Sequence, residues 1–147
     1  MIGARRRALC LEDRPGGLAD VAQALAPDIC DVEVALAGSG LSAHDPSAVD
    51  LVLVEIDLPP VRALRLIDVM KHDGRWRRVL LVAVYPHEPY DEDLFAVWRR
   101  GPDVKVWGKP EESRAAFLRK NLPGFLARLP ALSEGESRAT ANDAVPP

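Results

Sequence analysis

The sequence predicts an α/β fold in which helices cover both faces of an open parallel sheet. Short apolar runs alternate along the chain with segments whose apolar residues recur at every third or fourth position. This alternation is typical of strands joined through amphipathic helices. The runs are also continuously apolar, as strands buried on both faces must be.

Five runs are predicted as strands because they are short and rich in leucine or β-branched residues. They cover residues 8–11, 32–36, 51–56, 79–84 and 104–107. The run at 32–36 is the most polar of the five, so we place it at an edge of the sheet.

Four segments between or after these runs have helical spacing, at residues 18–25, 61–70, 94–98 and 111–129. Pro123 is expected to kink the last of them or to end its first part. The connection at residues 38–49 instead contains Gly, Ser, Asp and Pro, which favour turns. The helix expected between the second and third strands is therefore short or missing.

The 147 residues fit one domain, which we place at residues 1–132, followed by a polar tail at 133–147 that is expected to be disordered. No apolar run approaches the roughly 18 to 20 residues of a membrane span. The net charge of −3 argues against nucleic acid as a partner. We expect a cytoplasmic protein with no membrane association.

The cysteines and histidines give no sign of a metal site. Cys10 and Cys30 lie in apolar surroundings, and we expect both in the core. His44, His72 and His87 are far apart and next to turn-forming residues, so surface positions are expected for all three.

Charged residues follow three of the predicted strands. Glu12 and Asp13 follow the first, Glu55 and Asp57 the third, and Lys109 the fifth. In an open parallel sheet the functional crevice lies at the carboxyl ends of the strands. Carboxylates crowded there repel one another, so the cluster calls for a divalent cation or a lysine.

These residues resemble the receiver domain of two-component response regulators, over about residues 7–128. The resemblance rests on residues 9–13, 50–59 and 101–110. It implies a flavodoxin-like (βα)5 sheet in the order 2-1-3-4-5. It also implies an acidic pair that binds Mg²⁺, an aspartate phosphorylated by a histidine kinase, and a cis peptide bond in the Lys-Pro pair, here Lys109-Pro110.

Three positions depart from the family's pattern. The phosphoacceptor position holds Glu55, the Thr or Ser position holds Ala83, and the aromatic switch position holds Val106. We therefore expect an atypical, stand-alone pseudo-receiver that is not an enzyme, needs no cofactor and acts in signal transduction through protein partners. An ion pair between Lys109 and Glu55 would then have a structural role.

Three alternatives remain open at this stage. Glu12, Asp13 and Glu55 still offer oxygen ligands for a weak Mg²⁺ site. Asp57, or less usually Glu55, could accept a phosphoryl group in a phosphorelay. The crevice could instead hold a small ligand, because the short connection at residues 38–49 leaves a loop open.

The expected partner surface comprises the last two predicted helices and the last strand. Its candidate residues are Trp98, Arg100, Lys105 and Trp107, with further arginines at 114–119. Aromatic and arginine side chains are enriched in interfaces. Trp98 also falls on an apolar helical stripe, which predicts a core position. A second copy of this chain is the first partner to test.

Overall fold

The computed structural model describes residues 6–39 and 41–128; the predicted tail at 133–147 lies outside them. Five parallel strands form one sheet in the order β2-β1-β3-β4-β5, which confirms the predicted α/β architecture. The strands are β1 (Arg7–Glu12), β2 (Asp31–Leu36), β3 (Leu51–Glu55), β4 (Leu80–Val84) and β5 (Val104–Val106).

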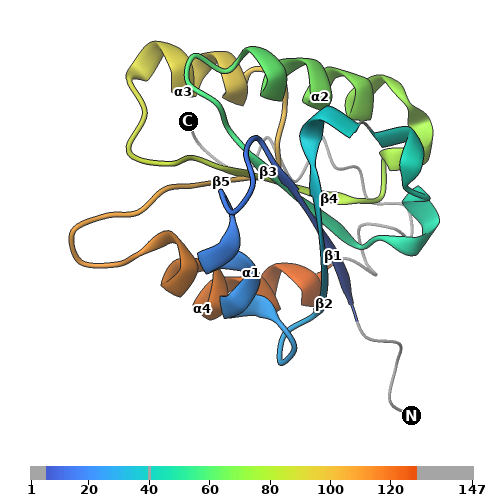
Figure 1. The fold of residues 1–147 in the computed structure, drawn as a ribbon, viewed down its shortest axis with the longest axis horizontal. Helices are drawn as coiled ribbons and strands as arrows, with labels where there is room; N and C mark the ends of the chain where they lie inside the picture. The colour runs from blue at the N-terminus through green and yellow to red at the C-terminus, as the bar shows by residue number, and fades with distance from the viewer. Residues whose placement is uncertain (1–5, 40, 129–147) are drawn as a thin grey trace.

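Two helices cover each face of the sheet (Figure 1). On one face lie α1 (Ala19–Leu25) and α4 (Arg114–Ala127), and on the other α2 (Val61–His72) and α3 (Asp91–Trp98). No helix of the described residues has the length and apolar character to cross a bilayer.

The last helix differs from its prediction at its start. It begins at Arg114 rather than near residue 111, because the Ser113 hydroxyl accepts a hydrogen bond from the Ala116 N–H and so caps it there. Pro123 does not end it, since the helix continues to Ala127.

The two core layers explain why the strands are continuously apolar. Cys10 and Cys30 are both fully buried on the α1 and α4 face, as predicted. Burial raises the pKa of the Cys10 thiol to about 12, so this cysteine stays protonated. The opposite layer contains Ile67 of α2 and Trp76, which follows α2 in the chain.

The described residues between β2 and β3 form no α-helix, as predicted. Three short 3-10 turns replace it, at Ala37–Ser39, Leu41–Ala43 and Pro46–Ala48. The Asp45 carboxylate accepts a hydrogen bond from the Ser47 N–H and caps the third turn. Leu41 and Pro46 are buried, so these turns still cover part of the sheet.

Candidate functional site

Glu12 is the last residue of β1, and its side chain anchors the loop that follows. Only 5% of the residue is exposed. Its carboxylate accepts hydrogen bonds from the backbone N–H of Gly16 at 3.1 Å and of Leu18 at 2.9 Å. A buried carboxylate is tolerated when such donors replace water. Gly16 has φ 82°, the left-handed conformation that glycine adopts readily, and this turns the loop back toward Glu12.

Glu55 is the last residue of β3, and its carboxylate contacts the same loop. It is also 5% exposed, and its Oε1 accepts hydrogen bonds from the N–H groups of Asp13 at 2.7 Å and Arg14 at 3.4 Å. A Cβ atom on Gly17 would lie 2.0 Å from Glu55 Oε1. The loop at residues 13–18 therefore closes directly over the Glu55 carboxylate, and a side chain at position 17 would have to displace that carboxylate or the loop.

The two aspartates of the predicted cluster are directed toward α2. The Asp57 carboxylate accepts hydrogen bonds from the N–H groups of Arg62 at 2.9 Å and Ala63 at 3.0 Å. It thus satisfies donors in the first turn of α2, where negative charge is favourable. Asp13 pairs with the Arg62 guanidinium at 3.1 Å.

The predicted ion pair between Lys109 and Glu55 is wrong. Lys109 is exposed, its ammonium lies 6.0 Å from the centroid of the Trp107 ring, and its backbone pairs with Glu112. Glu55 is satisfied by loop N–H groups instead, and its nearest cation is Arg14, with Nε 3.9 Å from Oε2. The predicted cis bond at Lys109-Pro110 is also wrong: within the described ranges, the cis bonds are Ala26-Pro27 and Leu58-Pro59.

Arg114 closes the same edge of the sheet from the side of α4. Its guanidinium donates to the carbonyls of Tyr85 at 3.0 Å and Gly17 at 2.8 Å, and it pairs with Asp20 at 2.8 Å. These hydrogen bonds hold the pKa of Asp20 below its usual value. Arg114 therefore links the end of β4, the β1–α1 loop and α1.

Arg114 and Arg119, which were expected on the partner surface, both make contacts within the chain. Arg119 donates to the Ala24 carbonyl and pairs with Asp28 at 3.0 Å. Both arginines thus contact the α1 side of the molecule. The sequence signal that could have located Arg114 is its place in the first turn of a helix, where a cation is disfavoured unless a nearby carboxylate compensates.

The positions that depart from the receiver pattern lie inside the sheet. Ala83 is fully buried and Val106 is 3% exposed. The neighbouring Tyr85 is also buried, and its ring meets Trp107 edge to face with centroids 5.8 Å apart. Burial raises the pKa of the Tyr85 hydroxyl. Apolar and aromatic packing therefore fills the interior near the carboxyl ends of β4 and β5.

The residues proposed for a weak Mg²⁺ site do not fit one in this arrangement. Glu12 and Glu55 direct their carboxylates at loop N–H groups, and Asp13 is paired with Arg62. Mg²⁺ requires oxygen ligands that converge in octahedral geometry. Within the part of the chain that the structure describes, no three His, Cys, Asp or Glu side chains are placed to share a metal ion.

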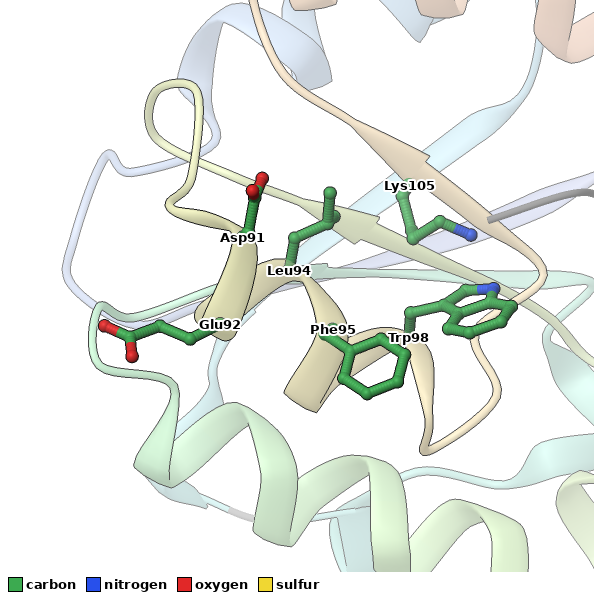
Figure 2. Close-up of a pocket in the computed structure, with 6 residues that line it drawn as sticks. All are labelled: Asp91, Glu92, Leu94, Phe95, Trp98 and Lys105. Carbon is green, nitrogen blue, oxygen red and sulfur yellow. The ribbon is translucent and has the colours of Figure 1, made fainter.

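The outer surface of α3 and β5 carries an apolar groove of about 360 Å³. Leu94, Phe95 and Trp98 line it from α3, and Lys105 borders it from β5 (Figure 2). Phe95 is 51% exposed. The Lys105 ammonium lies 5.8 Å from the centroid of the Trp98 ring, and burial lowers the pKa of this lysine. This group of four residues is called the α3 groove below.

Two of the four predicted interface residues lie in the α3 groove, and the other two lie outside it. Trp98 and Lys105 belong to the α3 groove, so the core position predicted for Trp98 is wrong. Arg100 pairs with Asp68 of α2, and Trp107 is half-buried beside Tyr85.

Comparison with known proteins gives a likeness in structure alone. No protein-family model matches the sequence, and neither does any curated protein. A response regulator receiver domain protein from Methanospirillum hungatei is 22% identical with a TM-score of 0.68, covering 90% of this chain and 100% of that one. The phosphorylated cyanobacterial phytochrome response regulator RcpA is 17% identical with a TM-score of 0.64, covering 90% of this chain and 97% of that one.

A third solved structure agrees with these two. The chemotaxis response regulator CheY4 of Vibrio cholerae is 16% identical, with a TM-score of 0.62, over 86% of this chain and 99% of that one. At such identities the likeness bears on the fold. The fold of this chain is accordingly that of response-regulator receiver domains.

Proposed function

We propose that this chain is an atypical receiver that signals through protein partners and is not phosphorylated at the position its fold relatives use. The observation that carries the proposal is the state of Glu55, which occupies the end of β3, is 5% exposed and accepts two loop hydrogen bonds. Phosphoryl transfer needs an accessible carboxylate oxygen in line with the donor. The closed loop at residues 13–18 opposes that approach.

The contacts of Asp57 also support this reading over phosphorylation at Asp57. Both of its oxygens accept hydrogen bonds from the start of α2, at 2.9 and 3.0 Å. Phosphorylation would require breaking at least one of these bonds. The alternative of a ligand in the crevice is likewise less favoured, because Glu12, Glu55 and Arg114 occupy the crevice with contacts inside the chain.

Treatment with acetyl phosphate and Mg²⁺, followed by acid quench and intact-mass spectrometry, tests the proposal. We expect no added mass of about 80 Da, which is roughly one phosphoryl group. A stable adduct on Glu55 would overturn the proposal, and one on Asp57 would favour the alternative of phosphorylation at that residue. The variants D57N and E55Q would then identify the acceptor, since the adduct disappears only when the modified carboxylate is removed.

We further propose a second copy of this chain as a partner, with the α3 groove as the contact. The first turn of α3 contains Asp91, Glu92 and Asp93, whereas Arg99 and Lys105 lie near its other end. Two such helices packed antiparallel about a two-fold axis would place each acidic end against the partner's basic end. The apolar groove would be covered at the same time.

Sedimentation velocity of Phe95→Asp tests this contact. We expect the unmodified chain to form dimers and F95D to remain monomeric. Val61→Asp is the matched control, because Val61 is 53% exposed and Phe95 51%, and Val61 lies on α2 outside the groove. A monomeric unmodified chain, or equal dimerisation of F95D and V61D, would contradict the proposal.

A further inference from the structure

The edge strand β2 is exposed along the outer side of the sheet. It comes first in the order β2-β1-β3-β4-β5, and no strand of residues 6–39 and 41–128 lies beyond it. None of its six residues is buried, whereas every residue of β3 and β4 is. Edge strands attract further strands unless proline, lysine, a bulge or a cover protects them. β2 contains no proline, lysine or bulge, and its two charged residues, Asp31 and Glu33, are both acidic.

The backbone of β2 has hydrogen-bonding groups on this outer side. The Asp31 N–H donates to the carbonyl of Arg6, which directly precedes β1, at 2.9 Å. Successive residues of a strand direct their N–H and C=O groups to opposite sides, so every second residue of β2 faces β1. The N–H and C=O groups of Val32 and Val34 therefore point away from β1. These are the groups with which an added strand would pair.

One face of β2 carries exposed apolar side chains. Val32 packs partly against the core layer beneath α1 and α4, and side chains two positions apart lie on the same face of a strand. Val34 and Leu36 therefore share that face, and they are 48% and 44% exposed. No other strand of the described residues has a large apolar side chain this exposed. An added strand could cover both side chains.

The opposite face of β2 is acidic. The side chain of Glu33 is 70% exposed there, with the His44 Nδ1 3.7 Å from its carboxylate. Glu33 lines a pocket at the amino edge of the sheet together with two further carboxylates, of Asp31 and Asp45, and one guanidinium, of Arg7. Acidic groups thus outnumber basic ones beside the strand. This charge repels an acidic strand, including a second copy of β2, and attracts lysine or arginine.

We propose that β2 binds an extended segment of a partner protein in which lysine or arginine alternates with valine, leucine or isoleucine. The segment would add a strand to the sheet, and its backbone would pair with Val32 and Val34. Its apolar side chains would lie beside Val34 and Leu36, and its basic side chains beside Glu33. In this mode main-chain hydrogen bonds supply affinity and alternate side chains supply specificity. The site lies at the opposite edge of the sheet from β5 and is separate from the α3 groove.

The test is amide hydrogen exchange, measured by NMR on the ¹⁵N-labelled full chain with the peptide acetyl-KVKVKVK-amide. This sequence is the same in both directions, so it suits a parallel or an antiparallel partner. At about 2 mM peptide, a Kd of about 0.5 mM would slow the exchange of the Val32 and Val34 N–H groups about fivefold. We expect this slowing, together with saturable shifts of the signals of residues 31–36.

Two peptides of the same length are the controls. Acetyl-KKVVVKK-amide has the same composition without the alternation, and acetyl-EVEVEVE-amide keeps the alternation with the opposite charge. We expect neither to slow the exchange of Val32 and Val34. Charge attraction alone shifts signals without protecting an N–H group, so exchange separates strand addition from loose association.

Substitutions in β2 separate the backbone contact from the charge contact. Val34→Pro removes the outward N–H, and proline is tolerated in an edge strand where that side faces solvent. We expect V34P to weaken binding about fivefold or more, and Val34→Thr, which keeps the N–H and the branched shape, to weaken it less. Glu33→Gln should weaken binding about three- to fivefold, as for an exposed ion pair. Glu111→Gln is the matched control: Glu111 is exposed at the carboxyl edge, so binding should not change.

Retained dispersion of the amide spectrum establishes that each variant is folded, and E33Q decides if V34P unfolds. The proposal is overturned if the alternating peptide leaves exchange unchanged, if either control peptide protects the two valines equally, or if folded V34P or E33Q binds as tightly as the unmodified chain. It is also overturned if both N–H groups are already protected without peptide, because another part of this chain or a second copy then covers the edge. None of these results depends on phosphorylation or on the α3 groove.

Discussion

The two edges of the sheet differ in how their buried polar groups are satisfied. At the carboxyl edge, Glu12 and Glu55 are buried and each accepts two backbone hydrogen bonds from the loop above. At the amino edge, the side chain of His44 is 10% exposed beside an open pocket, and its buried Nε2 has no hydrogen-bond partner among the described residues. The comparison shows that the loop over Glu12 and Glu55 is held by backbone hydrogen bonds to their carboxylates, whereas each edge has one buried polar atom without a hydrogen-bond partner among the described residues, Tyr85 Oη at the carboxyl edge and His44 Nε2 at the amino edge.

The largest expected effect concerns the close packing over Glu55. Gly17→Ala would place a Cβ 2.0 Å from Glu55 Oε1, so the loop or the carboxylate must move. We expect a loss of about 2 to 3 kcal/mol in the free energy of unfolding, as for other overpacked sites, measured by urea denaturation. Gly38→Ala is the control, because its Cβ would meet no atom within 4 Å. Equal stability of G17A and G38A would show that the loop is not closed over Glu55.

A pair of glutamate substitutions compares the two edges directly. Glu12→Gln exchanges one acceptor oxygen for an NH₂ group that faces the N–H of Gly16 or Leu18. We expect a loss of about 2 kcal/mol from the unpaired buried groups. Glu33→Gln at the exposed amino edge should change stability by about 0.5 kcal/mol or less. If E12Q and E33Q lost similar amounts of unfolding free energy in thermal and urea denaturation, the two edges would not differ in how their glutamates contribute to stability.

Arg114 should contribute more to stability than its neighbour Arg119. Its side chain is 15% exposed and joins three segments, while that of Arg119 is 51% exposed. Arg114→Met is expected to cost about 1.5 kcal/mol, because charged hydrogen bonds to buried carbonyls are lost. Arg119→Met should cost about 0.5 kcal/mol, as for exposed ion pairs. The reverse ranking in urea denaturation would contradict the role given to Arg114.

The smallest expected effect is the pH dependence of the Arg114 contribution. The pKa of Asp20 in the folded chain is held below its ordinary value of 3.8 by the Arg114 hydrogen bond. A depressed carboxyl pKa stabilises the fold above that ordinary value, and the stabilisation is lost as the pH falls through the folded-state pKa. The stability difference between the unmodified chain and R114M should therefore shrink from neutral pH toward pH 3. A difference that stays constant over this range would exclude Asp20 as the partner.

The sequence predicted the fold well because its signals are local. Each strand is a short apolar run, and the turn-forming residues between Gly38 and Val49 show directly that no crossover helix fits there. The positions of Glu55, Ala83 and Val106 within the sheet follow from the same runs. The departures from the receiver pattern could thus be located without a structure.

The contacts of the site could not be predicted in the same way. Glu55 receives its hydrogen bonds from residues more than 40 positions away, on a loop whose path depends on Gly16 and Gly17. The sequence shows these two glycines only as a turn. The sequence predicts surface positions for Arg114 and His44, because nothing next to them in the chain indicates the Asp20 and Glu33 carboxylates that they face.

The contacts of Glu12 and Glu55 should close the carboxyl edge to a metal ion and a phosphoryl group. The most direct measurement is an NMR titration of the ¹⁵N-labelled chain with Mg²⁺ and beryllofluoride, which imitates a bound phosphoryl group. We expect the amide signals of Asp13, Gly16 and Leu18, which donate to Glu55 and Glu12, to remain unchanged. Saturable shifts of these three signals would show that the loop opens to receive the ligand, and would contradict the account.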